Sequence, residues 1–221
     1  MDSLSTAHQV NHGEHTRVVT SSAAMNITGS PRATSPSQHT ALGRALLTMA
    51  LAAYGIPCLL RPEGGRLLDS VDLAIHETGH LVFAPFGEFV GFLGGTLFQL
   101  IVPAAFVVYF WRRGDRHGAS VPLWWVAQNL WNISVYVRDA RAEELPLVGG
   151  GEHDWAYLLG RMGWLPHDQG IGKTVHAAGS FIYLMAIVLG LLAAMRRIAL
   201  AKTDAETLGT SDGTLTVVDP R

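Results

Sequence analysis

Long apolar stretches separated by short charged segments dominate the middle of the chain. Five such stretches stand out, and they cover residues 41–60, 71–86, 89–111, 121–137 and 175–195. A helix of about 20 apolar residues is long enough to cross the hydrocarbon core of a bilayer. Tryptophans near the ends of 121–137 are typical of a membrane interface. The pattern therefore predicts an all-α fold, a polytopic membrane helix bundle of four to five membrane segments.

The two ends of the chain have a different character. Residues 1–40 are rich in Ser, Thr, His, Asn and Gly, and residues 201–221 are mostly polar. Segments of this kind bury too little apolar surface to offset the entropy lost on ordering. We predict a disordered N-terminal tail over 1–40, a membrane domain over 41–200 and a disordered C-terminal tail over 201–221.

Composition narrows the classes of function. Hydrophobic residues make up 48% of the 221 residues and charged residues only 15%, against about 25% charged in a typical soluble domain. The net charge of −2 and the lack of a basic face exclude nucleic acid as the expected partner and leave membrane lipid. The single cysteine, Cys58, excludes an intramolecular disulfide and a cysteine-based zinc ribbon. Any metal ion must therefore be bound by His, Asp and Glu.

A His-Glu-Thr-Gly-His run lies at residues 76–80, inside the second apolar stretch. Positions four apart lie on the same face of a helix, so His76 and His80 can share one ion. Glu77 lies beside that face and can act on a water as a general base. Asp72 lies on the same stripe, and we predict that it orients His76 through the second ring nitrogen. Asp69 and Ser70 are the predicted N-caps.

The alternative interpretation of this run is a polar cluster without a metal. Ionisable side chains at membrane depth are costly and usually mark function. Burying the polar groups of 76–80 in lipid without a partner would cost several kcal/mol. A bound cation would offset much of that cost, so the setting favours metal binding.

A catalytic zinc ion takes three protein ligands and leaves one position for water. The candidates for the third ligand are Asp139, Glu152, His153, Asp154, His167, Asp168 and His176. We favour Asp154 and then His153, because they follow a glycine run that permits close approach of the backbone and precede Trp155, which can anchor the loop. Asp139 remains an alternative, although it could equally form a surface ion pair with the neighbouring arginines.

Further polar residues interrupt the apolar stretches. They are Gln99, Gln128, Asn129 and Asn132. Such residues usually face other helices or a wet cavity, and contact between helices is the simplest role for each of them. Asn129 and Asn132 lie one turn apart, so together they could line a cleft.

The run at 76–80, with Leu145-Pro146-Leu147 and the following 149–154 segment, resembles the site-2 protease class of intramembrane zinc metalloproteases. The resemblance implies that a carboxylate of the later segment, at Asp154, completes the zinc site. The chain is also similar to a group of bacterial membrane proteins with His-Glu-x-Gly-His, Gly-Gly-x-x-x-Gln, Asp-Ala-Arg and His-Asp-Trp landmarks. That similarity implies a bacterial cytoplasmic membrane and no particular activity.

The sequence thus predicts an integral membrane zinc-dependent hydrolase. We expect a peptidase that acts on a membrane protein or peptide, with Glu77 as the catalytic base and His76, His80 and Asp154 or His153 as metal ligands. One alternative is a non-catalytic metal-binding membrane module. Another is a non-peptidase metalloenzyme, since Glu-x-x-His is half of a di-iron motif, although a second copy is absent from the sequence.

The arginines next to the apolar stretches bear on the membrane topology. The arginines expected on the cytoplasmic side are Arg61, Arg66, Arg112, Arg113, Arg116, Arg196 and Arg197. Five full crossings would then separate the 149–155 loop from the start of the metal-binding helix. The two meet only if the loop dips inward or the second segment does not fully cross, and Pro85 and Gly87 permit such a re-entrant path.

Overall fold

A computed structural model describes residues 36–63, 65–146 and 151–211. Every regular element in those ranges is helical, which confirms the all-α prediction. The helices are α1 (Pro36–Leu60), α2 (Leu67–Phe83), α3 (Glu88–Arg112), α4 (Arg116–Arg138), α5 (Asp154–Arg161) and α6 (Asp168–Ser211), with short 3-10 turns η1 (Ala84–Phe86) and η2 (Leu165–His167). The predicted N-terminal tail, apart from its last residues, lies outside the described residues.

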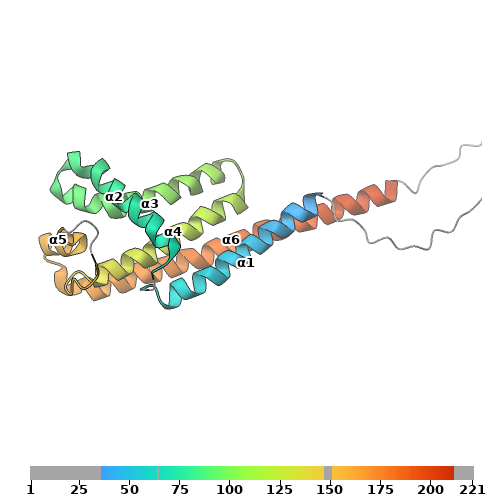
Figure 1. Cartoon of the computed structure of the whole chain (residues 1–221). Coiled ribbons are helices and arrows are strands. Elements are labelled where there is room, and N and C mark those ends of the chain that lie inside the picture. The colour runs from blue at the N-terminus through green and yellow to red at the C-terminus, as the bar shows by residue number, and fades with distance from the viewer. Residues whose placement is uncertain (1–35, 64, 147–150, 212–221) are drawn as a thin grey trace, which may run out of the picture. The chain divides into compact units, whose positions relative to one another are not determined.

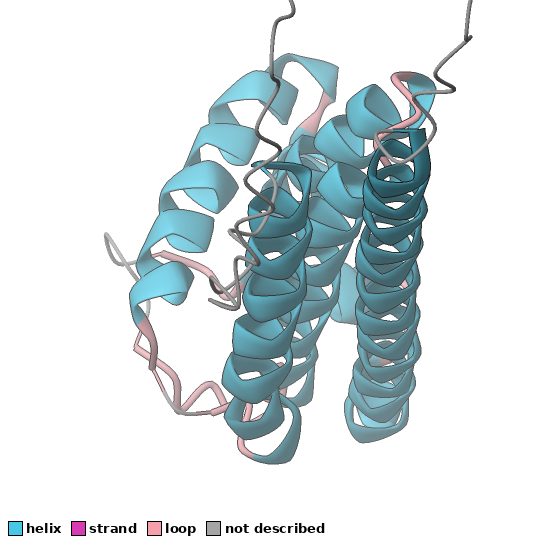
Figure 2. Ribbon diagram, turned by 90° about the vertical axis from the view of Figure 1, so that its right-hand side faces the viewer, coloured by secondary structure: helices cyan, strands magenta, loops and turns pink. Residues whose placement is uncertain are grey.

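Helix α4 forms the centre of the bundle. It packs against α6 and α3, while α1 packs on α6 and α2 packs on α3 (Figures 1 and 2). Trp131, Asn129 and Ser134 of α4 are almost completely buried. The indole N–H of Trp131 donates to Oγ of Ser180 at 3.1 Å, which ties α4 to α6. Polar and aromatic side chains of the fourth apolar stretch are thus buried and contact neighbouring helices.

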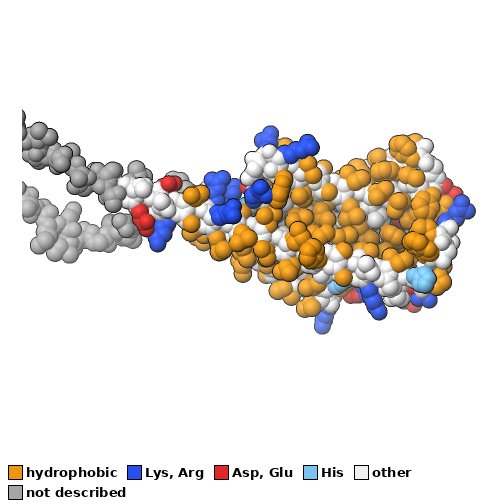
Figure 3. Space-filling view, turned by 180° about the vertical axis from the view of Figure 1, so that it is seen from behind, with side chains coloured by type: hydrophobic (Ala, Val, Ile, Leu, Met, Phe, Trp, Pro, Cys, Tyr) orange, Lys and Arg blue, Asp and Glu red, His pale blue; other side chains and the backbone are white. Residues whose placement is uncertain are grey.

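Three helices are long and apolar enough to cross a membrane, namely α1, α3 and α6. They carry large hydrophobic side chains on the surface, such as Leu46 (61% exposed), Phe106 (50%) and Phe181 (66%). Hydrophobic side chains cover most of the body of the face shown in Figure 3, and Lys and Arg lie at its margins. Among the described helices, α2 and α4 do not meet the same criterion of length and hydropathy.

Ion pairs show which segments share an end of the bundle. At one end, Arg44 near the start of α1 lies 3.4 Å from Asp115 in the α3–α4 turn. At the other end, Glu63 in the α1–α2 turn lies 3.2 Å from Arg138, the last residue of α4. The α1–α2 turn and the C-terminal end of α4 are therefore together.

This arrangement corrects the expected distribution of arginines. Arg61 and Arg66 lie at the opposite end of the bundle from Arg112 and Arg113, whereas five full crossings would have placed all four together. The physical reason is that α2 has 17 residues and spans only about 25 Å. The segments before and after α2 line the same cavity. Helix α2 therefore does not run from one end of the bundle to the other.

The start of α2 also differs from the prediction. Its N-cap is Arg66, and Asp69 occupies the third helical position, where Oδ2 accepts the backbone N–H of Arg66 at 2.7 Å. Asp69 thus caps the helix from inside rather than preceding it, and Ser70 lies within the first turns. An acidic group there also interacts favourably with the helix dipole.

Glycines set the distance between α2 and α3. A Cβ atom on Gly79 would collide with the carbonyl oxygen of Gly94 and with Cβ of Phe98. Gly87 follows η1 with φ +101, a conformation that favours glycine, and it lets the chain reverse into α3. The close contact between Gly79 and Gly94 brings the His-Glu-x-x-His face of α2 against α3.

The segment between α4 and the last apolar stretch contains the short helix α5, and α6 begins at Asp168. Helix α6 then continues to Ser211, past residue 200, where we placed the end of the membrane domain. Residues 212–221 of the predicted C-terminal tail lie outside the described residues.

We predict that Gly79→Val destabilises the protein, because the added side chain must push α2 away from α3. Overpacking of this kind costs about 1–3 kcal/mol. Gly43→Val is the matched control, since a Cβ on Gly43 of α1 has no atom within 4 Å. Thermal unfolding in detergent would measure both, and equal melting temperatures for the two variants would contradict the packing described here.

Candidate metal centre

His76 and His80 lie one turn apart on the face of α2 that is turned toward the protein. His76 is 8% exposed and His80 is half-buried. The centroids of the two imidazole rings are 4.7 Å apart and their planes meet at 80°. The predicted pairing of the two rings is therefore present, as the i, i+4 spacing in a helix requires.

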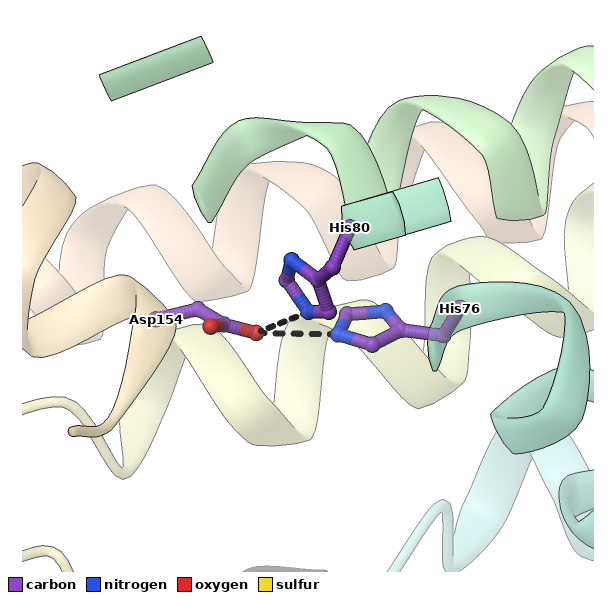
Figure 4. Close-up of side chains that lie close together, drawn as sticks. All are labelled: His76, His80 and Asp154. Carbon is purple, nitrogen blue, oxygen red and sulfur yellow. Dashed lines mark hydrogen bonds and ion pairs between the residues drawn. The ribbon is translucent and has the colours of Figure 1, made fainter. Parts of the chain in front are cut away.

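Asp154, the first residue of α5, completes the group. Its Oδ2 atom lies 2.9 Å from Nε2 of His76 and 3.3 Å from Nε2 of His80 (Figure 4). One ligand atom from each of the three residues lies within 4.8 Å of the other two, so the group could hold a metal ion. Of the candidates for a third ligand, Asp154 is the one that the structure brings to the histidines.

The Nδ1 atoms of both histidines are held by acceptors. Nδ1 of His76 lies 3.1 Å from Oε1 of Gln99, and Nδ1 of His80 lies 2.8 Å from the carbonyl oxygen of Gly91. The side chain of Gln99 is in turn oriented by its own N–H donation to Oδ1 of Asn132 at 3.1 Å. Histidines that bind metals usually donate their second N–H in this manner.

These contacts fix the chemistry of the opposite ring nitrogens. Because Nδ1 faces an oxygen acceptor, it carries the proton of a neutral ring, and Nε2 presents a lone pair. Both Nε2 lone pairs then face the same carboxylate oxygen of Asp154. Three lone pairs directed at one region need a cation or extra protons between them. One proton on either ring forms an ion pair with Asp154, whereas one metal ion can satisfy all three donors together.

Asp72 does not have the predicted role beside His76. Its Oδ1 atom accepts the indole N–H of Trp125 at 2.8 Å, so the carboxyl group is engaged with α4. Gln99 of α3 orients His76 instead. Asp72 and His76 lie on the same stripe of α2, but different helices cover their two turns. Asp72 therefore contacts α4, and His76 contacts α3.

Gly95 provides the space for the His76 ring. A Cβ atom on Gly95 would lie 2.6 Å from Nε2 of His76 and 2.7 Å from two of the ring carbons. Any larger residue would displace the ring. In the sequence, Gln99 follows Gly95 by one helical turn, so a glycine and an amide on one face of α3 together accommodate and orient the imidazole.

His153 positions Asp154 rather than joining the metal group. It is fully buried, its ring stacks on Tyr136 with centroids 4.2 Å apart, and its Nε2 atom lies 3.4 Å from Oδ2 of Asp139. Its Nδ1 atom accepts the backbone N–H of Ala156 at 3.2 Å and so caps α5. The predicted alternative ligand thus holds the turn that presents Asp154.

The remaining candidate ligands are engaged elsewhere. Asp139 accepts two backbone N–H groups of the following loop, Asp168 pairs with Arg141 at 2.7 Å, and His176 bonds the carbonyl oxygen of Leu59. His167 is exposed on η2, and Glu152 is exposed at the cavity.

Burial and the two histidines act in opposite directions on Asp154. Burial of the carboxyl group raises its pKa, but His76 and His80, when a proton sits on Nε2, donate to the carboxylate and outweigh that effect, so the pKa lies below its usual value. Asp154 is therefore an anion at neutral pH, which is the protonation state that a metal ligand requires.

The three residues border a cavity of about 770 Å³. Its lining includes Glu77, which is exposed on α2 next to His76, and the loop residues Leu145 and Pro146. The lining residues with acidic side chains are Glu63, Asp69, Glu77, Glu88, Glu152 and Asp154, and neither Lys nor Arg occurs among the described residues that line it. The cavity is thus lined by acidic side chains. They include Glu77, which the sequence predicts as the catalytic base.

Comparison with known proteins gives no further guide. The chain matches no protein-family model, no curated protein and no solved structure.

We predict that Asp154→Ala removes metal binding, because it deletes the one oxygen donor of the group. The loss of affinity for added Co²⁺ should exceed the roughly 10- to 100-fold cost of changes outside the ligand set. Glu152→Ala is the control, since it removes a neighbouring carboxylate of the same cavity. Equal Co²⁺ affinity in Asp154→Ala and the unaltered protein would rule out this ligand.

A second prediction concerns the residue that orients His76. Gln99→Leu should weaken Co²⁺ binding by roughly 10- to 100-fold without abolishing it, because the ring loses its acceptor but keeps its place in the helix. Gln169→Leu, at an exposed position of α6, makes the same change away from the group. An unchanged Co²⁺ titration for Gln99→Leu would show that Gln99 does not position the ligand.

Proposed function

We propose that this protein is an integral membrane zinc peptidase. The observation that supports the proposal most directly is the convergence of two histidine Nε2 atoms on one carboxylate oxygen of Asp154, beside Glu77 and a large cavity. Two imidazoles and one carboxylate are a ligand set of catalytic zinc sites, which keep one position open. The site-2 protease resemblance of the 76–80 run leads to the same reaction class.

The spacing of the ligand atoms fits zinc. Zn–N and Zn–O distances of about 2.0–2.1 Å in a tetrahedral site place neighbouring ligand atoms about 3.3 Å apart. The two separations between Asp154 and the histidines, 2.9 and 3.3 Å, lie close to that value. A di-iron site needs more carboxylates, and within the described residues the group contains one. The ligand set therefore supports a single zinc ion over a di-iron site.

In this proposal each residue has a defined part. His76, His80 and Asp154 bind the zinc ion, which supplies a Lewis acid for a peptide carbonyl and lowers the pKa of a water molecule. Glu77 accepts a proton from the attacking water and returns it to the nitrogen of the departing amine. Asp154 stays ionised, because its pKa lies below the usual value of a carboxyl group.

The proposal includes a membrane bundle in which α1, α3, α4 and α6 cross the bilayer and α2 does not fully cross. Helix α4 lacks the hydropathy of a lipid-exposed span, but it is enclosed by α1, α3 and α6, so lipid does not contact most of its polar side chains. The low hydropathy of α4 is therefore compatible with membrane depth. The α1–α2 turn and η1 then share one side, where the cavity lies.

The cavity also bears on the substrate class. A volume of about 770 Å³ accommodates several residues of an extended peptide, and a helical segment would have to unwind because its peptide bonds are shielded by their own hydrogen bonds. The acidic lining favours peptides that carry neutral or basic side chains near the cleaved bond. Membrane proteins or peptides of this type are the substrates we propose.

Glu77→Gln tests the catalytic role. We expect the variant to bind one zinc ion per chain as tightly as the unaltered protein, while cleavage falls about 100-fold or more, because an amide does not accept the proton. The assay uses protein reconstituted in liposomes with a set of synthetic transmembrane peptides, and mass spectrometry detects new termini.

The matched control is Glu206→Gln, which makes the same change at an exposed position of α6. Full turnover by Glu77→Gln would contradict the proposed base. Zinc binding without cleavage by any of these proteins would instead identify a non-catalytic metal-binding module.

A further inference from the structure

A second cavity, of about 380 Å³, lies at the end of the bundle where α1 finishes. It is bordered by the last residues of α1, the α1–α2 turn, the C-terminal end of α4 and the first turns of α6. Pro62 and Glu63 line both this cavity and the cavity of the metal centre. A ligand in the second cavity would therefore contact the turn that borders the first.

Different helices contribute different chemistry to the second cavity. Leu59 and Leu60 of α1 are apolar, and Leu60 is 71% exposed. Arg138 of α4 and Lys173 and His176 of α6 are basic. The cavity of the metal centre has the opposite character, since acidic side chains line it and neither Lys nor Arg occurs among its described lining residues. The second cavity thus combines apolar and basic groups.

The basic side chains of α4 and α6 lie against the same stretch of backbone. A Cβ atom on Gly172 would collide with Cγ of Arg138, so the arginine side chain crosses α6 immediately before Lys173. At its far end, Nη2 of Arg138 lies 3.2 Å from Oε1 of Glu63 and so holds the α1–α2 turn. The ion pair and Lys173 therefore border one space.

Lys173 supplies the charge that this cavity does not balance internally. Glu63 compensates Arg138, and Nε2 of His176 donates to the carbonyl oxygen of Leu59 at 3.0 Å. Lys173 is exposed and forms no ion pair within the described ranges of the chain. Its place near the start of α6 also gives its charge no favourable interaction with the helix dipole. With His176 neutral, the lining carries one net positive charge.

We propose that the second cavity binds the phosphate group of an anionic phospholipid. A phosphodiester carries one negative charge, which matches the net charge of the lining, and Arg and Lys are the usual partners of phosphate. A free anion would use the basic groups alone, whereas a lipid also covers Leu59 and the exposed Leu60 with the start of its acyl chains. A zwitterionic lipid has no net charge to match.

The position of the cavity suits a lipid headgroup. Helix α1 is long and apolar enough to cross a membrane and ends at Leu60, so a bilayer around α1 would place its headgroups at this level. A bound headgroup would hold Arg138 and the α1–α2 turn in place from outside the metal cavity. The inference depends on neither the metal ion nor the proposed peptidase activity.

Native mass spectrometry of the purified full chain in neutral detergent, with added phosphatidylglycerol, tests the site. We expect saturable retention of one phosphatidylglycerol per chain, and a rise in melting temperature that follows the same lipid concentration dependence. Phosphatidylcholine at equal concentration should give neither. Lys173→Gln should lower the apparent affinity for phosphatidylglycerol about fivefold, which corresponds to the roughly 1 kcal/mol that one Lys contributes near an anionic lipid surface. Lys173→Arg keeps the charge and should keep the affinity.

Lys202→Gln is the matched control, because it removes the same charge from an exposed position near the other end of α6 and should leave the lipid affinity unchanged. Equal retention of the two lipids, or equal affinity in Lys173→Gln and Lys202→Gln, would overturn the proposal. An equal loss in Lys173→Arg and Lys173→Gln would show that the charge does not bind the lipid and would also overturn it. Sodium phosphate that raises the melting temperature as much as phosphatidylglycerol does, at the same concentration, would assign the cavity to free phosphate instead.

Discussion

The convergence of two imidazole lone pairs on one buried carboxylate oxygen is the constraint on which the rest of the site depends. His76 and His80 can present Nε2 to Asp154 only because Gln99 and the Gly91 carbonyl accept from the opposite ring nitrogens. A ring proton or a metal ion between these atoms makes the arrangement favourable, and a metal ion can join all three residues at once. The packing of α3 and α5 around α2 therefore makes physical sense as a support for a bound ion.

Sequence periodicity predicted the parts of this site that are local. The i, i+4 pair at 76–80 follows from helix geometry alone, whereas the preference for Asp154 came from the glycine run before it and from the site-2 protease resemblance. The supporting contacts could not be obtained in this way. Gln99 reaches His76 across an interface between two helices, and Asp72 is taken by Trp125 of a third helix. His153 was weighed as a ligand, but its burial against Tyr136 is a tertiary feature that spacing does not encode.

Hydropathy predicted the helices but misjudged how the chain passes between the two ends of the bundle. Windowed hydrophobicity treats every helix as if lipid surrounded it. Helix α4 breaks that assumption because α1, α3 and α6 enclose it, and α2 breaks it because it is short and both flanking turns line one cavity. Arg61 and Arg66 therefore lie at the opposite end of the bundle from Arg112 and Arg113. When α2 does not cross, every turn after it lies at the other end from the one that full crossings would give.

Helix α2 is polar toward the protein and apolar toward the outside. Asp72 and His76 are buried, whereas Leu67, Leu81 and Val82 are 85%, 78% and 46% exposed. In water such a helix would gain by turning its apolar side chains inward, so the observed orientation is stable where the surroundings are themselves apolar. In that setting each buried polar group needs a partner inside the protein. Successive turns of α2 meet this requirement with partners from neighbouring helices, because Trp125 of α4 donates to Asp72, and Gln99 of α3 and Asp154 of α5 contact His76.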